Sequence, residues 1–312
     1  MKVHAKHGTV QEFLKENPVE GIEVVDDPKR CNYLISGRYT HSDYNLNLRG
    51  VIIPYTGHNG IDLNALRNDD LNLFVTPTRS RYVAEKAVSL TLALLGNTIN
   101  YHQLLKEGNW SSRNSDERLP WTSIQGLSVG LFGFGRIGKH IYKMLSGFDC
   151  EFYTIRRGKK HDEKIKQVKN LTNLVQMCDV IIIAAPLNDE TKDMIAKPIL
   201  SKMKKKFLIN VGRGKIVNEE DLYDALSNKK IKGYASDVWY NYPKNKEVML
   251  PSSYPIHQFD NVVLSNHSGG YTYNTNKEVN EDLLKMLIKL RDENFEDKLD
   301  LENLIWGARW KN

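Results

Sequence analysis

A glycine-rich loop in the middle of the chain has the residue types and spacing of a phosphate-binding turn. It reads Gly133, Phe134, Gly135, Arg136, Ile137 and Gly138. It follows an apolar run, Ser128–Phe132, and opens a helical segment, Lys139–Ser146. In that setting the first glycine permits a tight turn, the second lets the backbone approach a pyrophosphate, and the third allows close helix–strand packing. The loop therefore predicts a dinucleotide site; a glycine turn without a ligand is the alternative.

A basic cluster stands where dinucleotide-binding folds usually carry an acidic residue for the ribose 2′-hydroxyl. Arg156 and Arg157 lie there with Lys159 and Lys160, and residues 152–160 contain no carboxylate. Because a guanidinium can donate paired hydrogen bonds to a phosphate, the cluster favours NADP(H) over NAD(H). A basic surface turn beside bound NAD is the alternative.

The sequence predicts that strands alternating with helices position these residues. The strand-like runs after residue 127 are Ser128–Phe132, Glu151–Ile155, Val180–Ala184, Phe207–Val211, Gly233–Val238 and Val262–Leu264. Shorter runs of the same kind in residues 1–75 are Ile22–Val25, Tyr33–Ser36 and Val51–Tyr55. The alternation predicts an α/β protein with two Rossmann-like domains, each a doubly wound parallel sheet.

Two amphipathic segments predict where the chain passes between the domains. Apolar residues at helical spacing in 82–106 indicate one long helix that starts near Ser80, and Asn276–Arg291 forms a second. We expect one domain to comprise residues 1–82 and 276–312, and the other residues 83–275.

Composition restricts the class of protein. The chain has 312 residues, 40% of them apolar, and a net charge of +6, which suits anionic small molecules. The three cysteines, Cys31, Cys150 and Cys178, form no zinc or disulfide pattern. No nucleic-acid motif, signal peptide or membrane-spanning run is found in the sequence. We expect a soluble cytoplasmic protein without nucleic-acid or membrane partners.

Short motifs between about residues 50 and 275 supply a family resemblance. They are Val83-Ala84-Glu85, Ala185-Pro186-Leu187 with Thr191, Asn210–Gly214, Asp237-Val238-Trp239 and Asn266–Gly270. With the glycine loop, their order and spacing resemble the D-isomer-specific 2-hydroxyacid dehydrogenases. The resemblance implies hydride transfer between a nicotinamide cofactor and a small 2-oxo or D-2-hydroxy acid. It also implies a flavodoxin-like substrate domain, a cofactor domain and an active site in the cleft between them.

Arg213 and His267 match the family's catalytic arginine and histidine. The reaction must hold a 2-oxo acid by its carboxylate, polarise its carbonyl group and move a proton to or from the 2-oxygen. A guanidinium can donate to both groups, which suits Arg213. An imidazole with a pKa of about 6.5 suits the proton transfer, which the resemblance assigns to His267.

Tyr242 is where the sequence departs from the family. Relatives usually place a glutamate five residues after the aspartate of Asp-Val-Trp, and counting from Asp237 gives Tyr242. A glutamate would raise the pKa of the histidine, whereas a tyrosine hydroxyl can orient the ring but adds no negative charge. We therefore expect His267 to titrate lower than its counterparts. A substituting Glu247, or a Tyr242 that only packs beside the site, is the alternative.

Two features are expected to face the substrate. Thr56 and Gly57 align with the family's small-residue turn, whose amides bind the substrate carboxylate, and His58 beside them is interpreted as an exposed loop histidine. Arg79 stands four residues before Val83, where relatives often have asparagine. A cation there favours an acidic substrate, and a surface salt bridge is the alternative.

The family pattern also assigns cofactor contacts at or after the ends of four strands. Asp237 matches the residue that accepts from the nicotinamide carboxamide, and residues 185–187 should border the adenosine. The expected contacts outside the glycine loop and basic cluster are Ala185, Pro186, Leu187, Thr191, Val211, Gly212, Asp237 and Gly269.

Together with the resemblance, the sequence thus predicts an NADP(H)-preferring reductase of the glyoxylate and hydroxypyruvate class. The resemblance alone implies a homodimer that assembles through the cofactor domain. Within the fold, a formate dehydrogenase-like or phosphoglycerate dehydrogenase-like activity is an alternative. A protein of another functional class, a non-catalytic nucleotide-sensing binding protein, is a further alternative.

Overall fold

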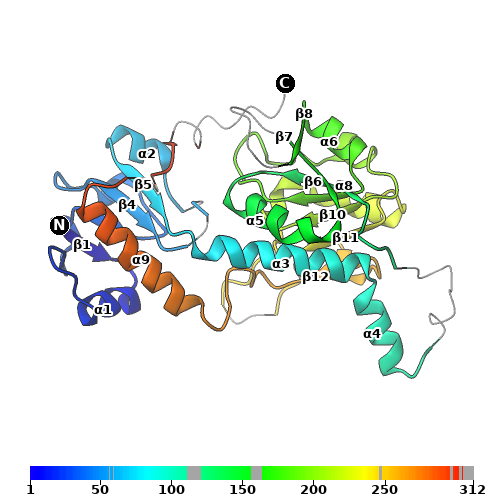
Figure 1. Ribbon diagram of the computed structural model, residues 1–312, viewed down its shortest axis with the longest axis horizontal. Helices are drawn as coiled ribbons and strands as arrows, with labels where there is room; N and C mark the ends of the chain where they lie inside the picture. The colour runs from blue at the N-terminus through cyan, green and yellow to red at the C-terminus, as the bar shows by residue number, and fades with distance from the viewer. Residues whose placement is uncertain are drawn as a thin grey trace. The chain divides into compact units, whose positions relative to one another are not determined.

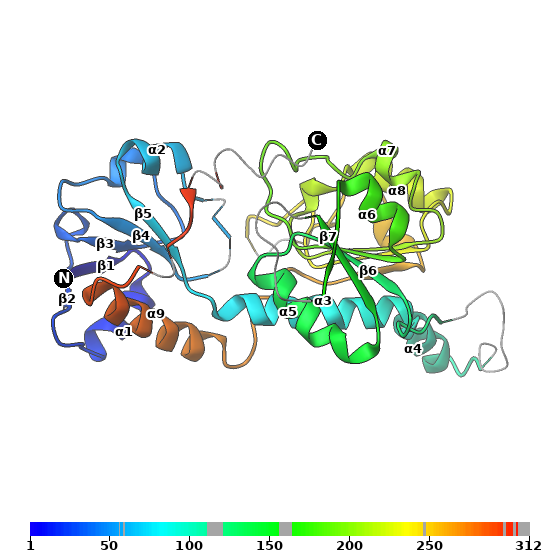
Figure 2. The same cartoon turned by 45° about the horizontal axis from the view of Figure 1, so that its top comes forward.

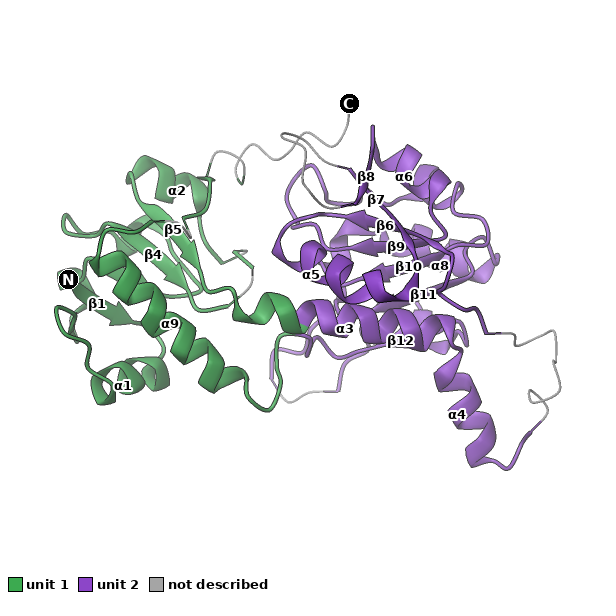
Figure 3. Cartoon of the chain, viewed as in Figure 1, with its two compact units in different colours: residues 1–82, 270–308 green, residues 83–269, 309–312 purple. Residues whose placement is uncertain are grey.

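Both parts of the chain are built on parallel sheets, which confirms the predicted α/β class with two Rossmann-like sheets. The computed structural model describes residues 1–55, 57–58, 60–110, 121–155, 164–245, 248–295, 298–301 and 304. Unit 1 comprises residues 1–82 and a second segment that begins at Gly270, and unit 2 comprises residues 83–269 (Figure 3). This segment begins before the predicted boundary at residue 276, and its Tyr271 packs on Arg79 of unit 1.

Unit 1 contains a five-stranded sheet of order β2-β1-β3-β4-β5. Its strands are β1 (Lys2–Ala5), β2 (Glu23–Val24), β3 (Tyr33–Ile35), β4 (Gly50–Ile53) and β5 (Asn72–Val75), with short 3₁₀ turns at Pro28–Arg30 and His41–Asp43. Helices α1 (Gly8–Glu16) and α9 (Thr275–Arg291) pack on one face, and α2 (Leu63–Asn68) packs on the other. Successive residues of β4 point to opposite faces, so that Ile52 joins the core of α9 and Ile53 the core of α2.

Unit 2 contains a seven-stranded sheet of order β12-β11-β10-β9-β6-β7-β8. Its strands are β6 (Ser128–Phe132), β7 (Glu151–Ile155), β8 (Lys166–Val168), β9 (Val180–Ile183), β10 (Phe207–Asn210), β11 (Gly233–Ser236) and β12 (Val262–Leu264). The chain order reverses at β6, which pairs with β7 on one side and with β9 on the other. Open α/β sheets bind ligands outside the carboxyl ends of the strands at such a reversal.

Helices cover both faces of this sheet (Figures 1 and 2). They are α3 (Thr78–Leu95), which begins in unit 1, α5 (Arg136–Leu145), α6 (Leu171–Met177), α7 (Lys197–Leu200) and α8 (Glu219–Ser227). Helix α4 (Thr98–Lys106) follows α3 and has no buried residue. Short 3₁₀ turns lie at Ser146–Phe148, Gly214–Ile216 and Ile256–Gln258. Helices α3 and α5 pack on one face, and α6, α7 and α8 on the other. Strand β9 is buried on both faces, which explains its unbroken apolar sequence.

The predicted single helix over 82–106 is wrong. Helix α3 ends at Leu95, and Asn97 has a left-handed φ of +51°, a conformation that a right-handed helix does not continue through. The chain then starts again as α4. Strands β1, β5 and β8 were not predicted individually. Within the described residues, no helix is both long and apolar enough to cross a membrane.

Candidate active site

The glycine loop turns sharply between the end of β6 and the start of α5. Gly133 has a φ of +107°, and a Cβ there would lie 2.6 Å from the backbone nitrogen of Ala185. A Cβ on Gly138 would lie 2.3 Å from the carbonyl oxygen of Gly133, because α5 packs directly on the turn. Gly135 is exposed, and a Cβ there would meet nothing within 4 Å. The first and third glycines are therefore required by packing, whereas the second leaves open space.

This open space fits a phosphate group at the N-terminus of α5. Gly135 is the N-cap of the helix and offers no side-chain oxygen to its first-turn amides, and Arg136 and Ile137 follow it half-buried. Helix N-termini attract anions through these amides and the helix dipole. The residues present therefore fit the pyrophosphate of a dinucleotide. Arg156 and Arg157, which follow β7 directly, lie outside the described residues.

The turn after β9 borders the glycine loop. Ala185 is buried against Gly133, Pro186 is exposed and Leu187 is half-buried. Thr191 has no exposed surface, and its hydroxyl donates to the Pro186 carbonyl oxygen at 2.7 Å. We therefore assign Thr191 to shaping the turn from inside and not to touching a cofactor.

Asn210, at the end of β10, fixes the turn that presents Arg213. Its buried side chain accepts from the Gly212 nitrogen and donates to the Arg213 carbonyl oxygen, both at 3.0 Å. Val211 and Gly212 are buried, and a Cβ on Gly212 would lie 2.6 Å from the Ala185 carbonyl oxygen. The half-buried Arg213 donates from Nη1 to the Gly212 carbonyl oxygen at 2.7 Å. Sequence reasoning assigned no role to Asn210, although a polar residue closing an apolar strand was a usable signal.

Asp237, at the end of β11, holds the loop that carries His267. One carboxylate oxygen accepts from Ser265 Oγ at 2.6 Å and from the Ser268 nitrogen at 3.1 Å, and the other accepts from the Gly269 nitrogen at 2.8 Å. Between these contacts His267 has a φ of +59°. The predicted cofactor residues Asp237 and Gly269 are thus joined to each other, and the carboxylate positions the histidine loop.

His267, Arg213 and Tyr242 lie together in unit 2. The ring centres of Tyr242 and His267 are 5.3 Å apart, and the Tyr242 hydroxyl accepts from the Trp239 nitrogen at 2.9 Å. Partial burial and the charge of Arg213 lower the pKa of His267, and Asp237 opposes them. Among the described residues no carboxylate forms an ion pair with His267; Glu247 lies outside them. Neither cause involves Tyr242, so the expectation that the tyrosine keeps this pKa below that of family counterparts stays a prediction.

The expected substrate residues lie in unit 1. Thr56 lies outside the described residues, and Gly57 has a φ of +104°. His58 is half-buried and not exposed as predicted, and its carbonyl oxygen accepts from the Ile61 nitrogen at 2.9 Å. Arg79 lies in the first turn of α3, with its guanidinium carbon over the rings of Tyr55 and Tyr271.

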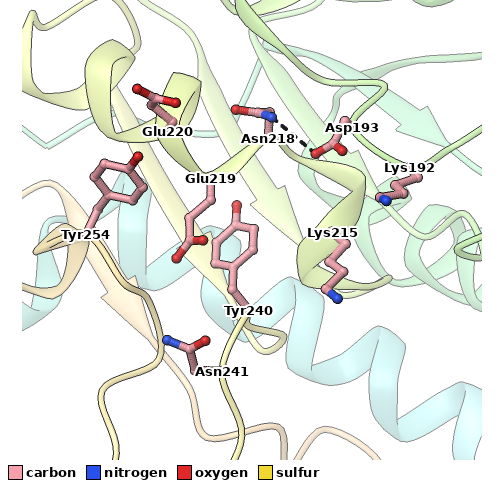
Figure 4. A pocket seen from close by; sticks show the side chains of 9 residues that line it. All are labelled: Lys192, Asp193, Lys215, Asn218, Glu219, Glu220, Tyr240, Asn241 and Tyr254. Atoms are coloured by element: carbon pink, nitrogen blue, oxygen red, sulfur yellow. Dashed lines mark hydrogen bonds between the residues drawn. The ribbon is translucent and has the colours of Figure 1, made fainter.

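A hollow of about 460 Å³ in unit 2 contains none of the predicted residues (Figure 4). Some of its polar groups are bonded within the fold: Glu219 accepts from Ser252 and Ser253, and the Tyr240 hydroxyl donates to Val217. Among the described histidines, cysteines and carboxylates, no three lie close enough to hold a metal ion.

A profile of the NAD-binding domain of D-isomer-specific 2-hydroxyacid dehydrogenases matches residues 88–269, more than half of the chain. The chain belongs to the D-isomer-specific 2-hydroxyacid dehydrogenase family. Unit 2 therefore carries this family's NAD-binding domain, with the glycine loop, Arg213 and His267 inside the matched range.

Individual members of the family are similar over most of this chain. A glyoxylate reductase from Thermofilum pendens is 32% identical over 78% of this chain and 71% of its own length. A formate dehydrogenase from Neurospora crassa is 29% identical over 80% of this chain and 66% of its own, so the chain spans less than two thirds of that relative. An NADPH-dependent glyoxylate/hydroxypyruvate reductase from Sinorhizobium meliloti has the same fold, with a TM-score of 0.76 and 23% identity over 96% of this chain and 97% of that one.

Proposed function

We propose that the protein is a nicotinamide-dependent oxidoreductase that reduces a small 2-oxo acid of the glyoxylate and hydroxypyruvate class to the D-2-hydroxy acid. The observation that carries the proposal is the grouping of Arg213 and His267 in the domain that holds the glycine loop, close enough for the arginine charge to lower the pKa of the histidine. The guanidinium can bind the carboxylate and carbonyl groups of a 2-oxo acid, and the imidazole beside it can donate a proton.

Each residue takes one task in this reaction. Arg213 donates to the substrate carboxylate and to its carbonyl oxygen, which orients and polarises the carbonyl group. His267 gives a proton to the 2-oxygen as the alcohol forms and takes it back in the reverse direction. Backbone amides of the turn at Gly57 bind the carboxylate. When bound, the cofactor supplies the hydride in one direction and accepts it in the other.

The preferred cofactor in this proposal is NADPH. Arg156 and Arg157 directly follow β7, whose neighbour β6 leads into the glycine loop. That position is next to the adenosine ribose in dinucleotide folds, and two arginines there would neutralise a 2′-phosphate.

The proposed assembly is a homodimer in the cytoplasm, formed through unit 2. Helix α4 has no buried residue and extends from the sheet of unit 2 (Figures 1 and 2). Ile99 and Leu105 on α4, with Trp110 and Trp121 beyond it, are 45% to 63% exposed. Large apolar side chains that gather on one part of a surface commonly mark a protein interface.

Formate oxidation is the second candidate, favoured by the neutral Tyr242 beside His267.

The test of the proposed function is a titration of the protein with NADPH and NADH, followed by assays of glyoxylate, hydroxypyruvate and pyruvate reduction and of formate oxidation. We expect NADPH to bind at least about tenfold tighter, or 1.4 kcal/mol, and at least one 2-oxo acid to be reduced. Turnover of formate alone would replace the reductase, and tight NADPH binding without any turnover would favour a sensing protein.

A further inference from the structure

Arg79 is held in one orientation by two aromatic rings of unit 1. The guanidinium carbon lies 4.6 Å from the ring centre of Tyr271 and 5.5 Å from that of Tyr55. Tyr55 itself is fixed, because its hydroxyl fills the space that the missing side chain of Gly37 leaves. A planar guanidinium stacked on aromatic faces loses little freedom when it binds a ligand.

The carboxylates of α9 that face α3 are bonded to the neighbours of Arg79. Arg81 Nη2 pairs with Glu278 at 2.8 Å, and the hydroxyls of Tyr82 and Thr78 donate to Glu278 and Asp282. Among the described residues, Arg79 forms no ion pair. The salt-bridge alternative from the sequence is therefore not seen in the described part of the chain.

Polar atoms near Arg79 are buried without a partner among the described residues. They are Arg79 Nε, Thr76 Oγ1 and Ser80 Oγ. Thr76 is 0% and Ser80 1% exposed, so water does not reach either side chain in this state. A buried donor that stays unsatisfied destabilises the fold, and an anionic ligand can satisfy it.

One contact within unit 1 connects Arg79 to the proposed substrate turn. The guanidinium carbon of Arg79 lies 5.5 Å from the ring centre of Tyr55, which stands two residues before Gly57. In the proposed function Arg213 and the turn at Gly57 bind the first carboxylate, so the charge of Arg79 is available for a second anionic group.

We infer that Arg79, whose guanidinium carbon lies over the rings of Tyr55 and Tyr271, binds a second anionic group at the far end of the substrate, so that the preferred substrate is a dianionic 2-oxo acid. This inference rests on the proposed function, which supplies the site for the 2-oxo carboxylate. A carboxylate and a phosphate share the chemistry that a guanidinium fork recognises.

The test compares oxaloacetate with 4-methyl-2-oxopentanoate, which has a similar shape but a neutral end. The wild type should prefer oxaloacetate in kcat/KM, and Arg79→Gln should lower that preference at least about tenfold. Arg79→Lys should keep part of it, and Arg81→Gln, a cation two residues away, should leave it unchanged. 3-Phosphooxypyruvate as a third substrate distinguishes phosphate from carboxylate as the better occupant.

The outcomes separate this inference from the proposed function. A wild type that reduces both acids equally, or an Arg79→Gln variant that keeps the preference, overturns the subsite and leaves the reductase intact. A wild type that reduces no 2-oxo acid overturns the reductase. In that case calorimetry with malonate decides the subsite: binding that Arg79→Gln abolishes supports it, and equal binding to both proteins overturns it.

Discussion

His267 is the residue whose protonation decides in which pH range each direction of the reaction runs. Reduction takes a proton from the imidazolium, and the pKa of that group is lowered by partial burial and by Arg213. The protonated form is lost as pH rises through the lowered pKa. We therefore predict that kcat/KM for reduction falls with a midpoint below about 6.5, the ordinary value, while oxidation gains over the same range. A midpoint above the ordinary value in the pH–rate profile would contradict this.

Tyr242 leaves this pKa low because it adds no negative charge. Tyr242→Glu places a carboxylate beside an imidazole whose ring centre lies 5.3 Å from that of the tyrosine. Opposite charges at short range favour the charged histidine, so the pKa of His267 should rise by about 1 or more. The reduction profile should then extend to higher pH. Tyr242→Phe, which removes the acceptor for Trp239 without adding charge, is the control, and an unmoved profile in Tyr242→Glu would disprove the explanation.

Asp237 acts on His267 both through its charge and through the loop. In Asp237→Asn an amide group replaces one oxygen and faces the N–H donors of the loop, so we expect a loss of about 1–3 kcal/mol in the free energy of unfolding. Loss of the negative charge should also move the reduction profile to lower pH, because Asp237 raises the pKa of His267. Chemical denaturation and the pH profile check both effects, with the exposed Asp224→Asn as control. A wild-type free energy of unfolding together with a wild-type pH profile in Asp237→Asn would contradict both proposed roles of Asp237.

At the scale of elements, the second glycine of the loop is a position where a substitution should affect ligand binding but not folding. Gly135 has a φ of −81°, which any residue tolerates, and a Cβ there meets nothing within 4 Å. We predict that Gly135→Ala keeps the wild-type melting temperature but weakens NADPH binding at least about tenfold, because the methyl group occupies the approach to the pyrophosphate. Gly147→Ala, equally free of contacts, is the matched control. Unchanged affinity in Gly135→Ala would place the pyrophosphate elsewhere.

The elements were predictable where burial leaves a continuous pattern. Strand β9 is apolar on both faces and was found within one residue, and the glycine loop located both β6 and α5. The break between α3 and α4 was missed because it depends on the left-handed Asn97, which the apolar spacing does not record. Strand β8 was missed because its three residues, Lys166–Val168, are not buried and have no periodic pattern.

For the molecule as a whole, the candidate site joins residues from distant parts of the sequence. The family pattern named Arg213 and His267, but not the hydrogen bonds of Asn210 and Asp237 that position them. Those bonds depend on the strand order β12-β11-β10, which brings residues 210, 237 and 265 to one edge of the sheet. Sequence spacing contains no direct record of that order.

The proposed dimer leads to a prediction about the assembly of the whole molecule. Leu105 is 50% exposed on α4, whose side chains are not buried within the chain. Leu105→Glu should shift the protein from dimer to monomer in sedimentation velocity, because a carboxylate buried in an apolar interface costs several kcal/mol. Glu107→Gln, next to α4, should leave the assembly unchanged. A wild-type protein that sediments as a monomer would contradict the proposed interface.

The central claim, that this chain reduces a 2-oxo acid through His267, is tested most directly by one comparison. The measurement is kcat/KM for NADPH-dependent reduction by the wild type and by His267→Asn, with NADPH affinity measured in parallel. Asparagine tolerates the left-handed backbone of this position, so the loop should persist while the proton donor is lost. We predict unchanged NADPH binding and at least a hundredfold loss of rate, about the contribution of general acid catalysis. Turnover retained at the wild-type rate in His267→Asn would contradict the mechanism.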